Sequence, residues 1–309
     1  MSFSKKSCCV AVMVLIAGFL AADTARKDAA KILQEMSWVD VQDYLKTNDM
    51  VIIPLGSTEQ HGPHLPLGSD YFLAREMSKE ISRKTGVVVA PVLTVGYSRY
   101  HGGFPGTLSL TPDTMVQVLF ETSQMLIGHG FHRILFFNFH GGNNIVQTRV
   151  IHRINHETEA VAVAIAEGGS IHESLEPPEG IQIDFFDWHA GKDETSMLLA
   201  VRPDLVRMDR AEKPQIHMTS RMEKIGTAAE DAPSLAVVFE ALLAVPSETG
   251  KGGASHELSS NGVWSFNDPN DATAEHGQKR IDYVVEGAVR FIEAWKTTEP
   301  VTTGPAASE

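Results

Sequence analysis

The chain has 309 residues, of which 43% are hydrophobic and 21% are charged. This composition excludes an intrinsically disordered protein and allows a large buried core. Acidic residues outnumber basic ones by 39 to 26, giving a net charge of −13. Because no run of lysine and arginine could follow a phosphate backbone, the sequence argues against nucleic acid as a partner.

The first 22 residues have the pattern of a secretory signal peptide. Lys5 and Lys6 precede an uncharged stretch at 8–22, which is shorter than the roughly 20 apolar residues that usually span a membrane. We therefore expect cleavage, export to the periplasm or the medium, and no stable membrane association of the mature chain. Both cysteines lie in this segment, so a metal in the remaining chain would be held by histidine and carboxylate side chains.

From about residue 37, short apolar runs alternate with longer amphipathic segments, as in repeated βα units. The apolar runs predict strands buried on both faces, at 50–55, 87–92, 133–139 and 161–166. The amphipathic segments predict helices at 70–83, 111–127, 143–157, from about 193, and at 273–295. Thr111 is the expected N-cap of the second of these, with Pro112 at its first position.

We expect one doubly wound α/β domain over residues 23–309, in which ligands bind at the carboxyl ends of the strands. Residues 203–260 have weak periodicity, and we expect them to cover or partly close a site.

A first cluster of polar residues, G-S-T-E-Q-H-G-P-H-L-P-L-G-S-D at 56–70, follows the first predicted strand. Glu59 and His61 are two residues apart, so in extended backbone their side chains leave on the same side. Asp70 begins the next helix. Carboxylate and imidazole groups suit zinc or manganese. A polar turn with Asp70 as a helix cap explains this loop equally well when it is considered alone.

A second cluster, F-H-G-G-N at 139–143, ends the third predicted strand. His140 stands where α/β active sites form, and the glycines allow backbone or substrate to approach closely. The alternative is a helix-initiating turn with Asn143 as its N-cap.

The third cluster is D-W-H-A-G-K-D-E-T-S at 187–196. It places His189 in a loop and Glu194 in the first turn of a helix, where acids are common for electrostatic reasons alone. Because three separate segments offer such groups at junctions between strands and helices, we expect them to converge. Of the other histidines, we expect His64 to donate a hydrogen bond to a ligating carboxylate and His101 to line the mouth of the site.

These motifs resemble those of the creatininase (creatinine amidohydrolase) family, metal-dependent hydrolases of small amides. The matching blocks stand in family order at 57–70, 104–110 (F-P-G-T-L-S-L), 140–143, 189–196 and, more weakly, 271–277 (D-A-T-A-E-H-G). The resemblance implies a single three-layer α/β/α domain with a mostly parallel sheet. It also implies a homo-oligomer and two divalent metal ions, zinc or manganese, with iron as a further option.

The resemblance also implies roles for individual residues. Glu59 and His140 would bind one metal, His61 would bind the other, and Asp70 would bridge both. His189 matches the family histidine that assists proton transfer.

Departures from the family pattern concern the second metal and the substrate. Creatininase has a metal-binding glutamate where this chain has Gly142, and we expect Glu194 to replace it. Creatininase also has a tyrosine at the position of Gly141 and a tryptophan at that of Phe185, while Trp188 would project differently. These differences argue for an amide other than creatinine, including formamides.

The resulting hypothesis is hydrolysis of a small amide, possibly cyclic or formyl, by a hydroxide shared between two metal ions, with His189 protonating the leaving nitrogen. Two alternatives remain open. One is a dinuclear phosphoesterase, which basic residues near the site, such as Arg99, would favour. The other is an exported protein that binds a metal or ligand without turnover.

Overall fold

The computed structural model describes residues 29–165, 187–242, 245 and 253–298. The signal peptide expected at 1–22 therefore lies outside the described residues. Within the described part of the chain, no helix combines the length and hydropathy required to span a bilayer.

Four parallel strands form a sheet in the order β2-β1-β3-β4. All residues of the two central strands are buried, which explains their continuous apolar sequences. The second predicted strand is shorter than expected, because Pro91 lacks the N–H that would extend the ladder. The strands are β1 (Met50–Leu55), β2 (Val88–Val89), β3 (Arg133–Asn138) and β4 (Val161–Ala164).

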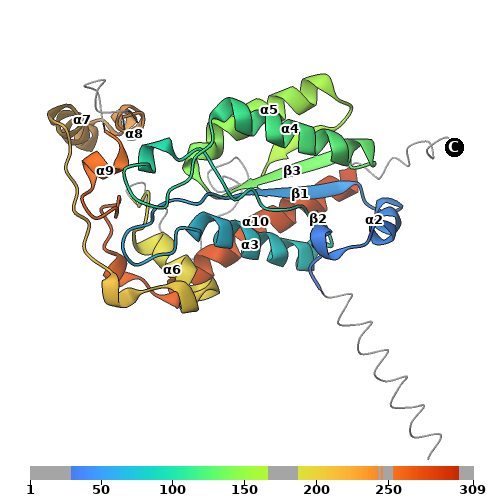
Figure 1. Cartoon of the computed structure of the whole chain (residues 1–309), viewed down its shortest axis with the longest axis horizontal. Coiled ribbons are helices and arrows are strands. Elements are labelled where there is room, and N and C mark those ends of the chain that lie inside the picture. The colour runs from blue at the N-terminus through green and yellow to red at the C-terminus, as the bar shows by residue number, and fades with distance from the viewer. Residues whose placement is uncertain (1–28, 166–186, 243–244, 246–252, 299–309) are drawn as a thin grey trace, which may run out of the picture.

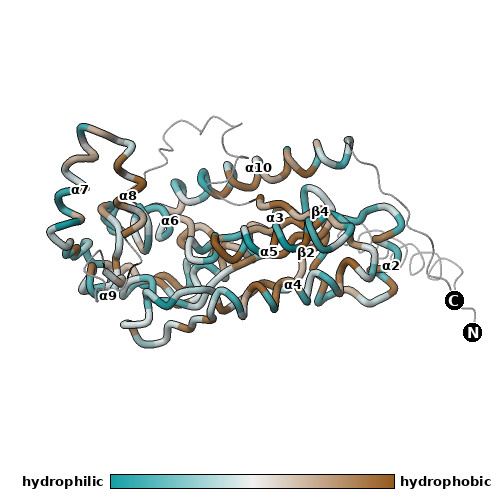
Figure 2. The backbone as a smooth tube through the Cα atoms, turned by 90° about the horizontal axis from the view of Figure 1, so that it is seen from above, coloured by the Kyte–Doolittle hydropathy of each residue, from teal (hydrophilic) through white to brown (hydrophobic). Residues whose placement is uncertain are grey.

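Helices cover both faces of the sheet, which confirms the three-layer fold (Figure 1). Val51 and Ile53 point to the layer of α4 and α5, whereas Met50 and Ile52 point to that of α3, α6 and α10. In Figure 2, α10 alternates between hydrophilic and hydrophobic residues, as expected for a helix with one face on a core. The helices are α2 (Trp38–Leu45), α3 (Ser69–Thr85), α4 (Pro112–Gly128), α5 (Asn144–Glu157), α6 (Lys192–Val201) and α10 (Ala274–Thr298).

The predicted capping of α4 is present, whereas the side-chain cap by Asn143, the alternative interpretation of the 139–143 motif, is absent. The Thr111 hydroxyl accepts a hydrogen bond from the Thr114 N–H, and Pro112 opens α4 as expected. Asn143 does not cap α5 with its side chain. Its amide instead accepts from the Tyr97 N–H at 3.0 Å and donates to the Gly56 carbonyl at 3.1 Å. Asn143 therefore ties together the loops that follow β1, β2 and β3.

Three short helices at the end of the molecule away from α2 form a covering region, α7 (Ser220–Asp231), α8 (Ala236–Glu240) and α9 (Ser255–Leu258) (Figure 1). They share a separate hydrophobic cluster that includes Met222, Phe239, Leu258 and Trp264. The Trp264 N–H donates to the His189 carbonyl at 3.0 Å. The covering region is thus joined to one of the predicted site loops.

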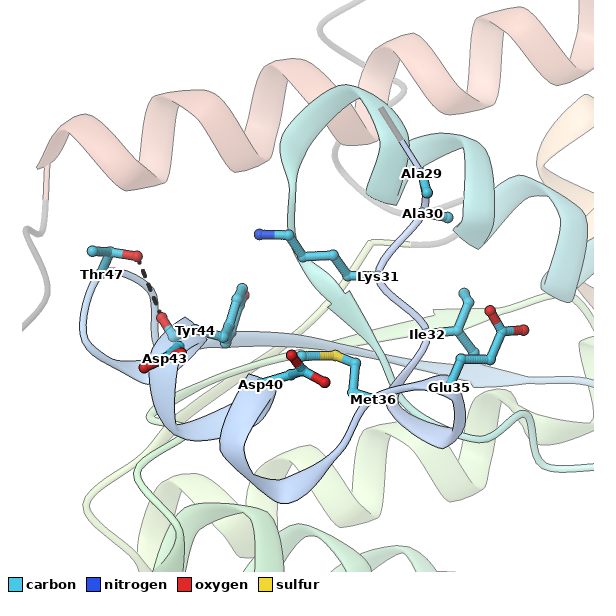
Figure 3. A pocket seen from close by; sticks show the side chains of 10 residues that line it. All are labelled: Ala29, Ala30, Lys31, Ile32, Glu35, Met36, Asp40, Asp43, Tyr44 and Thr47. Carbon is cyan, nitrogen blue, oxygen red and sulfur yellow. Dashed lines mark hydrogen bonds between the residues drawn. The ribbon is translucent and has the colours of Figure 1, made fainter. Parts of the chain in front are cut away.

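A cavity of about 440 Å³ lies beside α2 (Figure 3). Its lining residues include Lys31, Glu35, Asp40 and Tyr44, and none of the candidate site residues is among them.

Candidate metal centre

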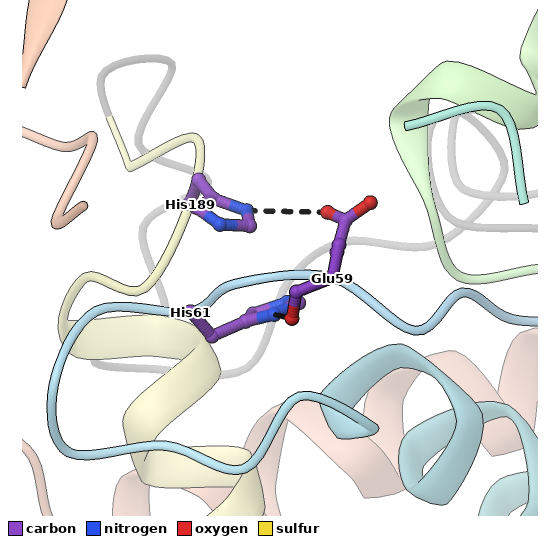
Figure 4. A group of neighbouring side chains, drawn as sticks. All are labelled: Glu59, His61 and His189. Carbon is purple, nitrogen blue, oxygen red and sulfur yellow. Dashed lines mark hydrogen bonds and ion pairs between the residues drawn. The ribbon is translucent and has the colours of Figure 1, made fainter. Parts of the chain in front are cut away.

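The three polar clusters of the sequence meet at the carboxyl ends of β1 and β3. Their nitrogen and oxygen atoms form three groups, in each of which all ligand atoms lie within 4.8 Å of one another. Figure 4 shows the first group, with the imidazole of His189 facing the Glu59 carboxylate. The groups are Glu59, His61 and His189; Glu59, Asp70 and His140; and His61, Asp70 and Glu194.

Asp70 belongs to two of these groups and uses a different oxygen in each. Its Oδ1 lies 3.2 Å from His61 Nε2, and its Oδ2 lies 3.4 Å from His140 Nδ1. Asp70 is the second residue of α3, where the helix dipole favours a negative charge. The loop before it folds back on itself, with the Glu59 N–H donating to the Leu67 carbonyl at 2.8 Å.

Glu59 is completely buried and lies among three imidazoles. Its Oε1 is 3.2 Å from His140 Nδ1, 3.3 Å from His101 Nε2 and 3.7 Å from His189 Nδ1. Neither of its oxygens, nor Asp70 Oδ2, has a hydrogen-bond partner of acceptable geometry. Buried carboxylate oxygens without such partners are costly unless a cation satisfies them.

Three histidines are held so that one ring nitrogen faces the carboxylates. In each ring the other nitrogen contacts a backbone carbonyl, which can only accept, so that nitrogen carries the proton. In the neutral ring the inward nitrogen therefore presents a lone pair, as in histidine ligands of metal sites. The pairs are His61 Nδ1 to the Glu59 carbonyl at 3.1 Å, His140 Nε2 to that of Tyr97 at 3.0 Å, and His189 Nε2 to that of Gln60 at 2.5 Å.

The electrostatic field of the cluster favours positive charge. Burial lowers the pKa of His61, but Asp70 and Glu194 outweigh burial and raise that pKa to about 10. Burial also lowers the pKa of His140, but Glu59 and, to a smaller extent, Asp70 outweigh this effect and raise the pKa to about 9. The same carboxylates that would stabilise an added proton would stabilise a divalent cation.

Glu194 completes the third ligand group, beside His61 and Asp70. Its Oε2 is 3.8 Å from His61 Nε2 and accepts a hydrogen bond from the Ala190 N–H at 2.6 Å. Burial raises the pKa of the Glu194 carboxyl to about 8, with His61 opposing and Asp70 adding to the shift. Ala190 itself has a φ of 55°, a conformation rare for a residue with a side chain.

The two glycines after His140 differ in their surroundings. A β-carbon on Gly142 would overlap the Tyr97 carbonyl, His140 Nε2 and the Tyr100 hydroxyl, so no side chain fits there. A β-carbon on Gly141 would meet nothing within 4 Å, and this residue is exposed. The chain therefore has no room for a carboxylate at Gly142 and has open space at Gly141.

Other residues proposed from the sequence lie farther from the ligand cluster. His64 Nε2 contacts the Thr195 hydroxyl at 2.8 Å rather than a carboxylate, which corrects the expected partner. Trp188 stacks on Phe239 with ring centroids 5.6 Å apart and belongs to the hydrophobic cluster of the covering region. Phe185 lies outside the described residues.

His101 is closer to the centre than its expected place at the mouth. It ends a short 3-10 turn, Arg99–His101, is 1% exposed, and stacks on His189 with ring centroids 4.2 Å apart. Burial lowers the pKa of His101 to about 4, although Glu59 opposes this shift. Sequence reasoning missed the contact between His101 and Glu59, because these residues are far apart in the chain and meet only through the tertiary fold.

These residues fit divalent cations by their chemistry. Buried carboxylates and inward-facing imidazole nitrogens are ligands that zinc and manganese accept. The carboxylate oxygens of Glu59 and Asp70 that make no hydrogen bond lie within the ligand groups themselves.

Comparison with known proteins gives the family. The sequence model of the family described as Creatininase, creatinine amidohydrolase, matches residues 34–292. The chain belongs to the creatininase family. It is a hydrolase of this family with a candidate metal-binding centre.

Similar proteins within the family have different named substrates. A mycofactocin precursor peptide peptidase of Mycolicibacterium smegmatis is 31% identical over 264 residues, covering 80% of this chain and 85% of that protein. A 3-dehydro-scyllo-inosose hydrolase of Thermotoga maritima is 30% identical over 182 residues, which is 58% of each chain. A manganese creatininase structure has a TM-score of 0.62 and 21% identity, over 87% of this chain and 98% of that one, and shows the shared fold.

Proposed function

We propose that this chain is a metal-dependent amidohydrolase that cleaves the C–N bond of a small amide at a two-cation centre. The observation that carries the proposal is the position of Asp70, whose two oxygens face two different histidines, His61 and His140. A carboxylate shared between two ligand groups is the arrangement required to bridge two cations.

Two of the three ligand groups support an assignment of side chains to two cations. Glu59, Asp70 and His140 would hold one ion, and His61, Asp70 and Glu194 would hold the other. Zinc and manganese suit these oxygen and nitrogen donors, and iron is a further option. When bound, a pair of divalent ions polarises a carbonyl and lowers the pKa of water toward about 7.

In this proposal Glu194 supplies the carboxylate that Gly142 cannot supply. The two residues lie on different elements, α6 and the turn after β3. The contact between Glu194 Oε2 and His61 Nε2, 3.8 Å, supports this assignment.

His189 is the proposed proton-transfer group. Burial and the neighbouring His61 and His101 hold its pKa well below the usual range, so the ring is neutral. Since Nε2–H donates to the Gln60 carbonyl, Nδ1 carries the lone pair. His189 would therefore first accept at Nδ1 a proton released by the attacking water and then deliver it to the departing nitrogen, which is a poor leaving group without a proton.

The open space at Gly141, where creatininase has a tyrosine, supports a substrate other than creatinine. The peptidase from Mycolicibacterium smegmatis named above extends the candidate bonds to peptides. We therefore propose formamides, cyclic amides and short peptides as the substrate classes to compare.

The contacts around the site support amide hydrolysis over phosphoester hydrolysis. Two basic residues lie close in sequence to site residues: Arg99 is exposed, and Lys192, two residues before Glu194, is half-buried. The ion pairs described within the ligand cluster join histidines to carboxylates. A phosphoesterase would need additional positive charge for a phosphate group.

The test combines elemental analysis with a substrate panel. Purified protein should contain about two divalent ions per chain and should release amine from at least one amide class. A chelator should abolish this release, and added manganese or zinc should restore it. Activity confined to phosphoesters, or ion binding with no turnover of any amide, would contradict the proposal.

We also propose export and self-association. The basic and apolar pattern of residues 1–22 supports cleavage of a signal peptide. Amino-terminal sequencing of the secreted or periplasmic protein tests the cleavage, and sedimentation equilibrium tests the homo-oligomer.

A further inference from the structure

Gln60, which lies between Glu59 and His61, contacts two imidazoles at once. Its backbone carbonyl accepts a hydrogen bond from His189 Nε2 at 2.5 Å, and its side-chain nitrogen lies 3.1 Å from His101 Nδ1. Neither Gln60 nor His101 belongs to the ligand groups described above. Their contacts with those groups therefore need a separate explanation.

The hydrogen bonds of Gln60 fix where the proton of His101 lies. The side-chain oxygen of Gln60 accepts from the Gly62 N–H at 2.9 Å, so the other end of the amide is the nitrogen. An amide nitrogen donates, and His101 Nδ1 must therefore accept. The proton of the neutral His101 ring is then on Nε2.

The Nε2 side of the His101 ring lies next to the buried carboxylate of Glu59, in an electrostatic contact that lacks the geometry of a full hydrogen bond. His101 Nε2 lies 3.3 Å from Glu59 Oε1, the same oxygen that is 3.2 Å from His140 Nδ1. The His101 ring is buried between His189, on which it stacks, and Trp264, whose ring centroid is 5.9 Å away at an interplanar angle of 85°. These neighbours restrict rotation of the ring and keep Nε2 directed at Glu59.

We infer that His101 is a positioning residue that orients the Glu59 carboxylate through the electrostatic contact of its Nε2–H with Oε1, with Gln60 fixing the tautomer. This inference rests on the proposed function, because it takes Glu59 to be a cation ligand. A ligating carboxylate held by a fixed N–H loses less conformational freedom when the ion binds. His101 thus contributes to cation affinity without touching the cation.

The experiment compares two amide side chains that differ by one methylene. In His101→Gln the amide nitrogen reaches the position of Nε2 and faces Glu59. The shorter side chain of His101→Asn would place its amide near the position of His101 Nδ1 and away from Glu59. At that position it would meet Gln60 and Ser255, whose hydroxyl lies 2.8 Å from His101 Nδ1. The full-length mature chain is stripped of metal and titrated with Mn²⁺ by calorimetry.

We expect His101→Asn to weaken one of the two Mn²⁺ sites by about 10-fold to 100-fold, with the other site unchanged. His101→Gln should bind both ions close to the wild-type affinity. His256→Asn is the matched control, because His256 is exposed and lies directly after Ser255; it should bind like wild type.

A second variant, Gln60→Met, keeps His101 and removes only the amide that fixes its tautomer. Gln60→Met should weaken the same Mn²⁺ site as His101→Asn. If His101→Asn does not give a cooperative unfolding transition, the Mn²⁺ affinity of Gln60→Met tests the inference in its place.

Wild-type affinity in both His101→Asn and Gln60→Met would overturn the inference. Equal weakening in His101→Gln and His101→Asn, with both proteins folded, would also overturn it, because the donor to Glu59 would then be irrelevant. Absence of Mn²⁺ binding in the wild type would instead refute the proposed function, and the inference with it.

Discussion

The carbonyl oxygen of Tyr97 occupies the space that a β-carbon on Gly142 would need. This contact excludes any side chain at the position where creatininase has a metal-binding glutamate. A carboxylate from another element, Glu194 on α6, lies in one group of candidate ligands with His61 and Asp70. This exclusion is testable, because placing the family's glutamate at position 142 should not restore a cation site that has lost Glu194.

Glu194→Gln should bind one ion per chain, because the amide removes the charge that the second cation requires. Adding Gly142→Glu to this variant should not recover the second ion, since even Gly142→Ala should cost about 1–3 kcal/mol through overpacking. Elemental analysis and urea unfolding measure these effects. Glu286→Gln, an exposed substitution on α10, is the control. Two ions in Glu194→Gln would remove Glu194 from the ligand set.

Asp70→Asn should lower the content of both ions, because one neutral amide cannot bridge two cations. Its activity should fall to that of chelated wild type, as measured by amine release on the best substrate. The thermal midpoint of wild type should decrease on chelation, whereas that of the variant should hardly change, since there is little bound metal to remove. Asp282→Asn, an exposed carboxylate on α10, should behave like wild type. A variant that kept two ions would refute the bridge.

His189→Ala should retain both ions and lose about 10²-fold to 10⁴-fold in kcat, the usual contribution of a proton-transfer group. The loss should be smallest for substrates whose leaving amine has a low pKa, because these need less protonation. Steady-state kinetics on a series of anilides, together with metal analysis, separates the two properties. If the variant instead lost an ion, His189 would be a ligand, as its grouping with Glu59 and His61 allows.

His64→Asn should have a pH-dependent effect on stability. Burial lowers the pKa of His64 to about 4, below its unfolded value near 6.5. Between these values the unfolded state binds more protons, so the contribution of His64 to wild-type stability falls as pH falls. The destabilisation by His64→Asn, measured by urea unfolding of metal-free protein, should thus shrink by up to about 2 kcal/mol from pH 7 to pH 4.5. A pH-independent difference would show that His64 titrates normally.

Much of the fold follows from local sequence pattern. The buried strands β1 and β3 are near-continuous apolar runs, and α4 begins where Thr111 and Pro112 predict it. Since parallel strands place their carboxyl ends at one edge of the sheet, the meeting of the loops at Glu59 and His140 is also predictable.

The remaining features depend on contacts that sequence pattern does not encode. Residues 203–260 include short helices that pack on their own hydrophobic cluster, so their periodicity is weak. Asn143 looks like a helix cap but bonds to Tyr97 and Gly56, far away in sequence. His101 and Gln60 lie in recognisable motifs, yet their contact with each other exists only in the folded chain.

The backbone pairing of Trp264 with His189 has a consequence for changes of specificity in this family. Trp264 belongs to the same small apolar cluster as Phe239 and Leu258, so mutations that repack this cluster would shift His189, the proposed proton-transfer residue, together with the covering region. Engineering a new substrate by exchanging these helices would therefore need to preserve the backbone pairing of Trp264 with His189, whereas substitutions on the outer faces of α4 and α5 would be free of that constraint.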